Sequence, residues 1–369
     1  MALRMSFVAL LLALGAFLGL GLPAEATNKA IEVRILERRV EAQVEAVSQE
    51  GAVLIGGRPV KGRMKLEARG NQLRLNGEIV LGAHLEIGRP VDSSQVELRW
   101  PGAARKYPGR VVVTVERGKL VLVNVVPVET YVAGVVSAEM PEAWPVAAKR
   151  AQAVLARTLA LRGGDHPGGG LCDLTHCQAY AGERRPEGVQ VALETRGRVL
   201  TYQGRLIQPL YHSTCGGERV SNATIFGGAA LPYLQEGSDP YCEASPHAAP
   251  WSVRVLDSEV AKALDVRRVE SLVVLGQSEG GWVAQVAADG RVMSGYRFWQ
   301  AVGRELGWGV LKSMRFTVRK DGGAFVFEGR GLGHGVGLCQ WGAKGQAARG
   351  IPYARILASY YPGTAIARR

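Results

Sequence analysis

Short runs in which apolar and polar residues alternate dominate the chain from residue 31 to about residue 110. Runs such as VEAQVEAV, LRLNGEIVL and SQVELRW are followed or interrupted by Gly, Asn or Pro. Alternation with a period of two is typical of strands that bury one face, and Gly and Asn favour the tight turns between them. We therefore predict a β-rich module over residues 27–115.

The apolar pattern changes from strand-like to helical spacing after residue 127. Apolar residues at positions 131, 132, 135 and 136 predict a short amphipathic helix over residues 128–138. A second helix is expected from Pro145 to about Arg162, because proline suits the first turn and two glycines follow the end. Glu139 lies at the junction, where a helix on either side can hold its side chain firmly.

The remainder of the chain returns to short strands and long glycine-rich loops from about residue 168 onward. The apolar segment 253–286 mixes helical and strand patterns and is interpreted as an insertion. The pattern as a whole predicts an α+β fold, with a mixed domain over residues 116–369 whose two adjacent helices carry Glu139.

The first residues of the chain predict export. Arg4 precedes an apolar run over residues 7–22, and the triplet at 24–26, Ala-Glu-Ala, has the small-x-small form that signal peptidases accept. The run is shorter than the roughly 20 residues that span a bilayer. We therefore expect residues 1–26 to be a cleaved signal peptide, with no stable transmembrane segment afterwards and a location in the cell envelope or outside the cell.

The charge of the chain favours polyanionic partners. The formal net charge is +12, which attracts nucleic acid, acidic lipid or the anionic polymers of a cell wall. The arginines are scattered rather than interleaved with aromatic residues, a pattern that argues against nucleic acid as a partner.

The segment at 124–161, NVVPVETYVAGVVSAEMPEAWPVAAKRAQAVLARTLAL, resembles the central signature of the stage II sporulation protein D family, also called the SpoIID/LytB domain family. Three further pieces follow in the family's order: DLTHCQAYAG, YHSTCGGERVSNATIFGGAALPYL and GRGLGHGVGLCQWGAKGQAARG. The resemblance implies a secreted lytic transglycosylase that cleaves the MurNAc-GlcNAc bond of peptidoglycan glycan strands and leaves 1,6-anhydroMurNAc ends. Relatives named LytB are described as amidase enhancers. The alternative is therefore a non-catalytic glycan-binding protein or an enhancer of another cell-wall hydrolase.

The resemblance assigns the catalytic acid/base to Glu139 in the AEMP element and the family's helix arginine to Arg157. One carboxylate suffices for a lytic transglycosylase, because the 6-hydroxyl of the muramic acid attacks C1 in place of water. The acid must be neutral near pH 7, which the apolar flanks of Glu139 favour. Glu142 is read as a solvated or capping residue. Arg157 either donates to Glu139 or a sugar carboxylate, or lies on a solvated helix face.

The glycine-rich segment GLGHGVGLCQWGA lets the backbone approach a ligand closely. We expect His334, Gln340 and Trp341 to line the sugar groove. His212 is a further candidate for a substrate hydrogen bond or a metal ligand.

The five cysteines need an explanation in an exported chain, because an oxidising compartment forms disulfides. Some family members hold zinc near the active site with cysteine and histidine side chains, the N/S ligands that zinc prefers. The resemblance therefore makes Cys172, His176 and Cys177 candidate zinc ligands in this chain. The alternative to a zinc site is a disulfide of Cys172 with Cys177, or of either with Cys215. If zinc made the protein a hydrolase, the reaction would also need a general base, which the sequence does not identify. Cys215 and Cys242 are expected to form a structural disulfide, with the remaining cysteine, Cys339, unpaired.

Overall fold

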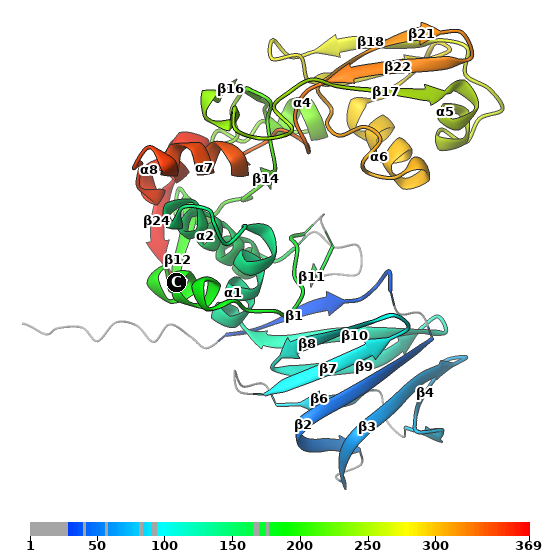
Figure 1. The fold of residues 1–369 in the computed structure, drawn as a ribbon, viewed down its shortest axis with the longest axis vertical. Helices are drawn as coiled ribbons and strands as arrows, with labels where there is room; N and C mark the ends of the chain where they lie inside the picture. The colour runs from blue at the N-terminus through cyan, green and yellow to red at the C-terminus, as the bar shows by residue number, and fades with distance from the viewer. Residues whose placement is uncertain are drawn as a thin grey trace, which may run out of the picture.

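The chain forms three lobes that follow one another in an arc, each around its own buried apolar core (Figure 1). The expected signal peptide, Asp165 and His176 lie outside the residues that the structure describes. Among the described residues, no helix is long and apolar enough to cross a membrane. The computed structural model describes residues 29–39, 42–55, 58–80, 84–89, 94–164, 170–174 and 177–369, with the backbone alone for 48–55 and 58–61.

A mostly antiparallel sheet forms the first lobe, as the alternating pattern predicted (Figure 1). It continues past residue 115, because Glu116 pairs with Lys119 in the hairpin of its last two long strands. Its main path runs in the order β11-β1-β10-β9-β6-β2-β3-β4-β5, with β7 paired to β2 and β8. The strands are β1 (Ala30–Ile35), β2 (Gln43–Ile55), β3 (Arg58–Arg69), β4 (Gln72–Leu75), β5 (Glu78–Ile79), β6 (Leu85–Gly88), β7 (Gln95–Trp100), β8 (Ala103–Pro108), β9 (Arg110–Glu116), β10 (Lys119–Pro127) and β11 (Leu171–Cys172).

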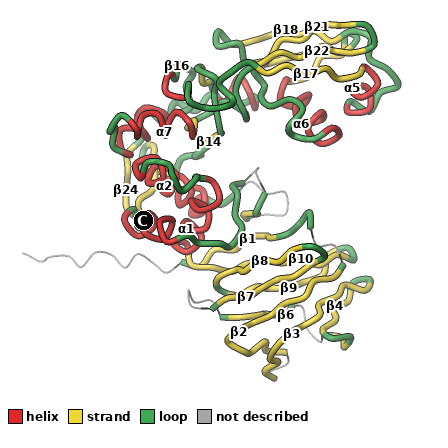
Figure 2. Tube along the Cα trace, viewed as in Figure 1, coloured by secondary structure: helices red, strands yellow, loops and turns green. Residues whose placement is uncertain are grey.

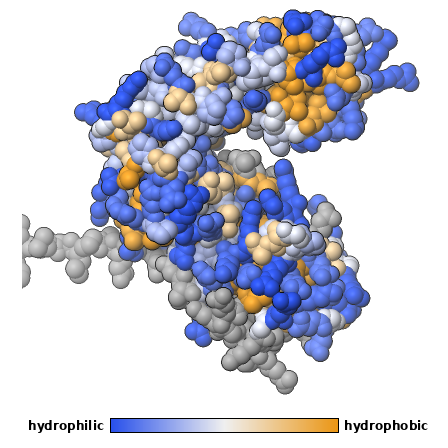
Figure 3. Space-filling view, in the orientation of Figure 1, coloured by the Kyte–Doolittle hydropathy of each residue, from blue (hydrophilic) through white to orange (hydrophobic). Residues whose placement is uncertain are grey.

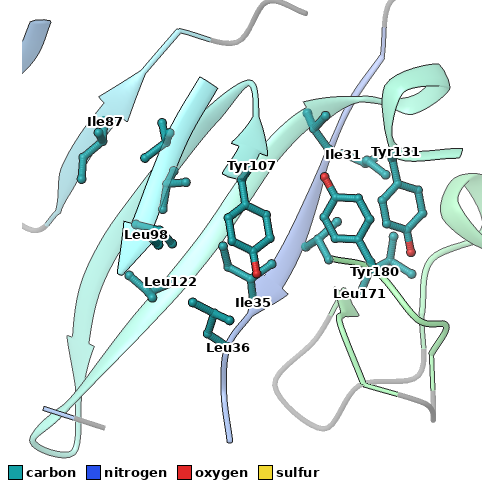
Figure 4. Packing of buried hydrophobic residues seen from close by; sticks show 14 of the residues in the cluster. Ile31, Ile35, Leu36, Ile87, Leu98, Tyr107, Leu122, Tyr131, Leu171 and Tyr180 are labelled. Atoms are coloured by element: carbon teal, nitrogen blue, oxygen red, sulfur yellow. The ribbon is translucent and has the colours of Figure 1, made fainter. Parts of the chain in front are cut away.

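Helices α1 (Val128–Glu139) and α2 (Val146–Arg162) follow the sheet at the positions that the sequence predicted. The core of the first lobe joins α1 to the sheet, and Figure 4 shows Tyr131, Tyr180 and Tyr107 in a row between them. The ring centroids of Tyr131 and Tyr180 are 4.9 Å apart, and those of Tyr180 and Tyr107 are 6.2 Å apart. This packing fixes α1, which ends at Glu139, on the sheet.

The second lobe is rich in helices and loops (Figure 2). Helix α2 connects the first two lobes, because Ala153 and Ala156 belong to the first core while Val154 and Leu155 belong to the second. Its other elements are α3 (Pro186–Glu194), β12 (Arg198–Tyr202), β13 (Arg205–Leu206), β14 (Tyr211–His212), β15 (Glu218–Arg219), α4 (Asn222–Phe226), β16 (Gly237–Ser238), the 3-10 helix η1 (Pro240–Cys242), β23 (Leu338–Cys339), α7 (Gln340–Ala348), α8 (Tyr353–Tyr360) and β24 (Ala365–Arg368).

The third lobe is inserted between η1 and β23, and it extends beyond the segment 253–286 that the sequence indicated. Its own core includes Phe298, Phe316 and Phe327, and Figure 3 shows open space between this lobe and the first. The combination of sheets and packed helices confirms the α+β class. The elements of the lobe are β17 (Trp251–Leu256), α5 (Asp257–Ala263), β18 (Leu272–Gln277), β19 (Val283–Ala288), β20 (Arg291–Ser294), α6 (Gly295–Leu306), β21 (Phe316–Asp321) and β22 (Ala324–Gly329).

Candidate active site

Glu139 is the last residue of α1 and is half-buried. The helix ends there because Met140 is extended, with φ −118° and ψ 120°, and a proline follows. Met140 is buried in the core of the second lobe, whereas the preceding turns of α1 pack in the first. Glu139 therefore lies where the first two lobes meet.

Three donors from distant parts of the chain hold the Glu139 carboxylate. The Ala179 backbone N–H and the Tyr211 hydroxyl donate to Oε1 at 2.7 and 2.9 Å. The Gln340 side-chain amide donates to Oε2 at 3.0 Å. The setting is thus more polar than the flanking residues suggested, because segments far away in the sequence converge on the carboxylate.

Tyr211 and Gln178 are site residues that the sequence analysis did not identify. Burial, and secondarily the charge of Glu139, raises the pKa of Tyr211, so its hydroxyl keeps the proton that it donates. Gln178 is buried, its Oε1 lies 3.5 Å from the Tyr211 hydroxyl, and its Nε2 donates to the Tyr131 hydroxyl at 2.8 Å. Both residues lie within the segments that resemble the family. That position was the sequence signal that could have identified them as site residues.

Gln340 and Trp341 lie at the start of α7, and the structure brings Gln340 to Glu139 as a direct partner. Trp341 is half-buried, and its ring packs edge-on against Trp144 at 5.0 Å between centroids. The Lys344 ammonium lies 4.0 Å from the centroid of the Trp341 ring. Of the two expected groove residues of α7, Gln340 contacts the carboxylate directly, and Trp341, next to Gln340 in the chain, packs against Trp144.

The side chain of His212 is buried. It is only 4% exposed, so the expected hydrogen bond to a sugar is wrong. Its Nδ1 lies 3.1 Å from the Val336 carbonyl oxygen, and its ring lies 5.5 Å from that of His334. Burial lowers the pKa of His212 to about 3 and that of His334 to about 4, so both imidazoles are neutral at pH 7.

Arg157 is completely buried, so a solvated helix face is the wrong interpretation. Its guanidinium makes a two-point ion pair with Glu129, with Nε to Oε1 at 3.0 Å and Nη2 to Oε2 at 2.5 Å. It also donates to the carbonyls of Ala192 and Arg198, each at 3.1 Å. Glu139 is not among these partners. Glu129 lies in the first turn of α1, and Glu139 is the last residue of the same helix.

Cys172 and Cys177 lie together, with their thiols hydrogen-bonded and no disulfide between them. The bond to Cys177, followed by burial, raises the pKa of Cys172. The Leu174 backbone N–H also donates to Cys172 Sγ at 3.3 Å. Two neighbouring cysteine sulfurs fit the N/S donor set that zinc prefers.

The expected disulfide between Cys215 and Cys242 is absent. Their sulfurs are 3.6 Å apart, compared with about 2.05 Å in a disulfide. Cys339 is a free thiol, and the Cys215 backbone N–H donates to its sulfur at 3.4 Å. The three cysteines instead form one cluster.

A cavity of about 160 Å³ lies beside Glu139, since its chain neighbour Ala138 and its hydrogen-bond donor Ala179 both line it. Asp173 lines the same cavity, and its Oδ2 accepts from the Leu36 backbone N–H at 2.9 Å. The cavity has a basic side formed by Arg38, Arg39 and Arg105.

Comparisons with known proteins identify relatives of this chain. A family model described as stage II sporulation protein matches residues 116–202, which include Glu139. An uncharacterized protein of Brachyspira hyodysenteriae is 30% identical over 272 residues, covering 71% of this chain and 72% of that protein. Stage II sporulation protein D of Bacillus subtilis is 29% identical over 308 residues, covering 76% and 87%. The amidase enhancer of the same organism is 26% identical over 295 residues, covering 63% and 40%. The chain belongs to the stage II sporulation protein D family.

Proposed function

We propose that this protein is a lytic transglycosylase of the bacterial cell envelope that cleaves the MurNAc-GlcNAc bond of peptidoglycan glycan strands. The observation that carries the proposal is the Glu139 carboxylate, held by three donors at the meeting point of two lobes. In the described part of the chain, no second carboxylate shares this hydrogen-bonded group. Glycoside hydrolysis by water ordinarily uses two carboxyl groups.

A single glutamate can perform the whole reaction in sequence. Protonated Glu139 gives its proton to the glycosidic oxygen, and the resulting carboxylate then accepts the proton of the 6-hydroxyl as that oxygen attacks C1. Oε1 already accepts two hydrogen bonds, whereas Oε2 accepts one, from Gln340, among the described residues. Because a carboxylate oxygen has two lone pairs, Oε2 is the oxygen with a position left for the transferable proton.

The basic cavity beside Glu139 supports an anionic glycan as substrate. MurNAc without a stem peptide carries a free lactyl carboxylate, and Arg38, Arg39 and Arg105 offer guanidinium groups that recognise carboxylates well. The open space between the first and third lobes leaves an approach for an extended polymer (Figure 3). Glycan stripped of stem peptides is therefore the substrate that fits best.

Zinc bound at Cys172 and Cys177, with His176 as a further ligand, is part of the proposal. Cys177 precedes the Ala179 N–H donor by two residues. A structural ion there would stabilise the loop that brings this N–H to Glu139.

The second candidate function is glycan binding with enhancement of a separate amidase, which the similarity to the amidase enhancer favours. The experiment that separates the two functions is incubation of the purified protein, without residues 1–26, with intact and with denuded glycan. Release of anhydromuramic fragments from denuded glycan supports the transglycosylase. No cleavage of either substrate, together with faster digestion by an added amidase, would replace it with the enhancer function.

A further inference from the structure

A second cluster of soft ligands lies on the other side of the strand that carries Tyr211. It brings together three segments: β14 with the loop after it, the end of η1, and β23. The side chains are all buried, with exposed fractions of 4%, 0%, 1% and 0% for His212, Cys215, Cys242 and Cys339. A ring nitrogen of His212 and the sulfurs of Cys215 and Cys339 lie within 4.8 Å of one another.

His212 supplies an independent sign that a ligand belongs at this cluster. Its Nε2 is buried and has no hydrogen-bond partner among the described residues. Its Nδ1 lies 3.1 Å from the Val336 carbonyl oxygen, to which it donates in the neutral tautomer with a free Nε2. A histidine that binds a metal through one nitrogen characteristically donates the other to a carbonyl or carboxylate.

The sulfurs are surrounded by N–H donors suited to thiolates. Cys339 Sγ accepts from the Cys215 backbone N–H at 3.4 Å and from the Gly342 N–H, at the start of α7, at 3.3 Å. Thiolate is the form of cysteine that binds metal.

The spacing of the sulfurs fits metal coordination. A tetrahedral zinc ion with Zn–S bonds of about 2.3 Å separates two sulfur ligands by about 3.8 Å, and Cys215 and Cys242 are 3.6 Å apart. We propose that His212, Cys215, Cys242 and Cys339 bind zinc in a closed four-coordinate structural site. Three cysteines and one histidine form a common ligand set of such sites.

This proposed site is distinct from the pair Cys172 and Cys177. Two of its ligands are chain neighbours of residues that hold the Glu139 carboxylate. His212 follows Tyr211, and Cys339 precedes Gln340; Tyr211 and Gln340 are two of the three donors to Glu139. Successive side chains of a strand point to opposite faces. Zinc on one face of the paired strands β14 and β23 would therefore fix Tyr211 on the other face. Through Cys339, the N-cap of α7, it would also fix the start of the helix that carries Gln340.

The test measures zinc by elemental mass spectrometry in protein purified without added metal. Four forms are compared: wild type, Cys339→Ser, His212→Ala, and the double variant Cys172→Ser/Cys177→Ser. The zinc content of Cys339→Ser should fall by one ion per chain, and His212→Ala should show the same loss. The double variant should retain one ion per chain, because it leaves the proposed ligands intact.

Two results would overturn the site. One is a double variant that binds no zinc, which decides the question even if Cys339→Ser does not fold. The other is a disulfide-linked peptide pair containing Cys215 and Cys242 in wild type digested without reductant. Neither measurement depends on glycan cleavage, so a failure here is distinguishable from a failure of the proposed activity.

Discussion

The Tyr211 hydroxyl donates a hydrogen bond to Glu139 Oε1 at 2.9 Å, and 72 residues separate the two in the chain. Tyr211 is carried by β14 and Glu139 by the end of α1. The bond therefore couples the Glu139 carboxylate to the second lobe, while α1 couples it to the sheet of the first. Removing this donor should affect the carboxylate without moving α1.

Tyr211→Phe should lower kcat by about tenfold and leave KM for denuded glycan nearly unchanged. A hydrogen bond to a charged group contributes about 1.5–3 kcal/mol, and Ala179 and Gln340 still hold the carboxylate in the variant. Steady-state kinetics of anhydromuramic fragment release measure the effect. Tyr202→Phe, a tyrosine that packs against Tyr233, is the matched control and should keep wild-type kcat. A Tyr211→Phe enzyme with unchanged kcat would show that this bond does not serve catalysis.

Glu139→Gln should abolish glycan cleavage and leave folding and glycan binding nearly intact. The substitution preserves the size of the side chain and removes the transferable proton. Cleavage assays and sedimentation with insoluble denuded glycan measure the two properties separately. Glu142→Gln is the control, because Glu142 is an exposed carboxylate three residues away and should keep full activity. Wild-type turnover in Glu139→Gln would exclude Glu139 as the acid.

Arg157→Ala should lower the free energy of unfolding by about 3–5 kcal/mol, because it leaves the Glu129 carboxylate without its buried partner. Chemical denaturation monitored by circular dichroism gives the difference. Arg150 lies on the same helix and pairs with Glu194, with its side chain 37% exposed. Arg150→Ala should therefore cost less than about 1 kcal/mol. Equal losses in the two variants would contradict the structural role of Arg157.

The sequence predicted α1, α2 and the strands of the first lobe because their patterns are local. Apolar residues at helical spacing, and prolines at the boundaries, are visible without tertiary information. The partners of Glu139 were less predictable, since they depend on which long-range pairings bring Tyr211 and Ala179 to it. The assignment of His212 over its neighbour Tyr211 shows the difficulty: in a two-residue strand, only the pairing with β23 determines which side chain is buried.

The buried ion pair of Arg157 and the cluster of three cysteines show the same limit of prediction from sequence. Arg157 carries no local sign that it is buried, and its position follows from Glu129 at the far end of α1. For Cys215 and Cys242, chain spacing indicated a disulfide, while Cys339 joins them only through the pairing of β23 with β14. The chemistry of a residue type was readable from the sequence, but the set of residues that share one site was not.

The product of the reaction distinguishes a transglycosylase from a hydrolase. Asp173 lines the cavity beside Glu139, and burial raises the pKa of its carboxyl group. Among the described residues, Asp173 is therefore the candidate for a second acidic group in the reaction. If Glu139 works alone, fragments formed in ¹⁸O-labelled water should contain no label. In ordinary water they should be about 18 Da lighter than hydrolytic products, the mass of the water that was not added. Asp173→Asn should then still form anhydromuramic ends. Labelled reducing ends in the wild type that disappear in Asp173→Asn would instead assign water as the nucleophile and Asp173 as its base.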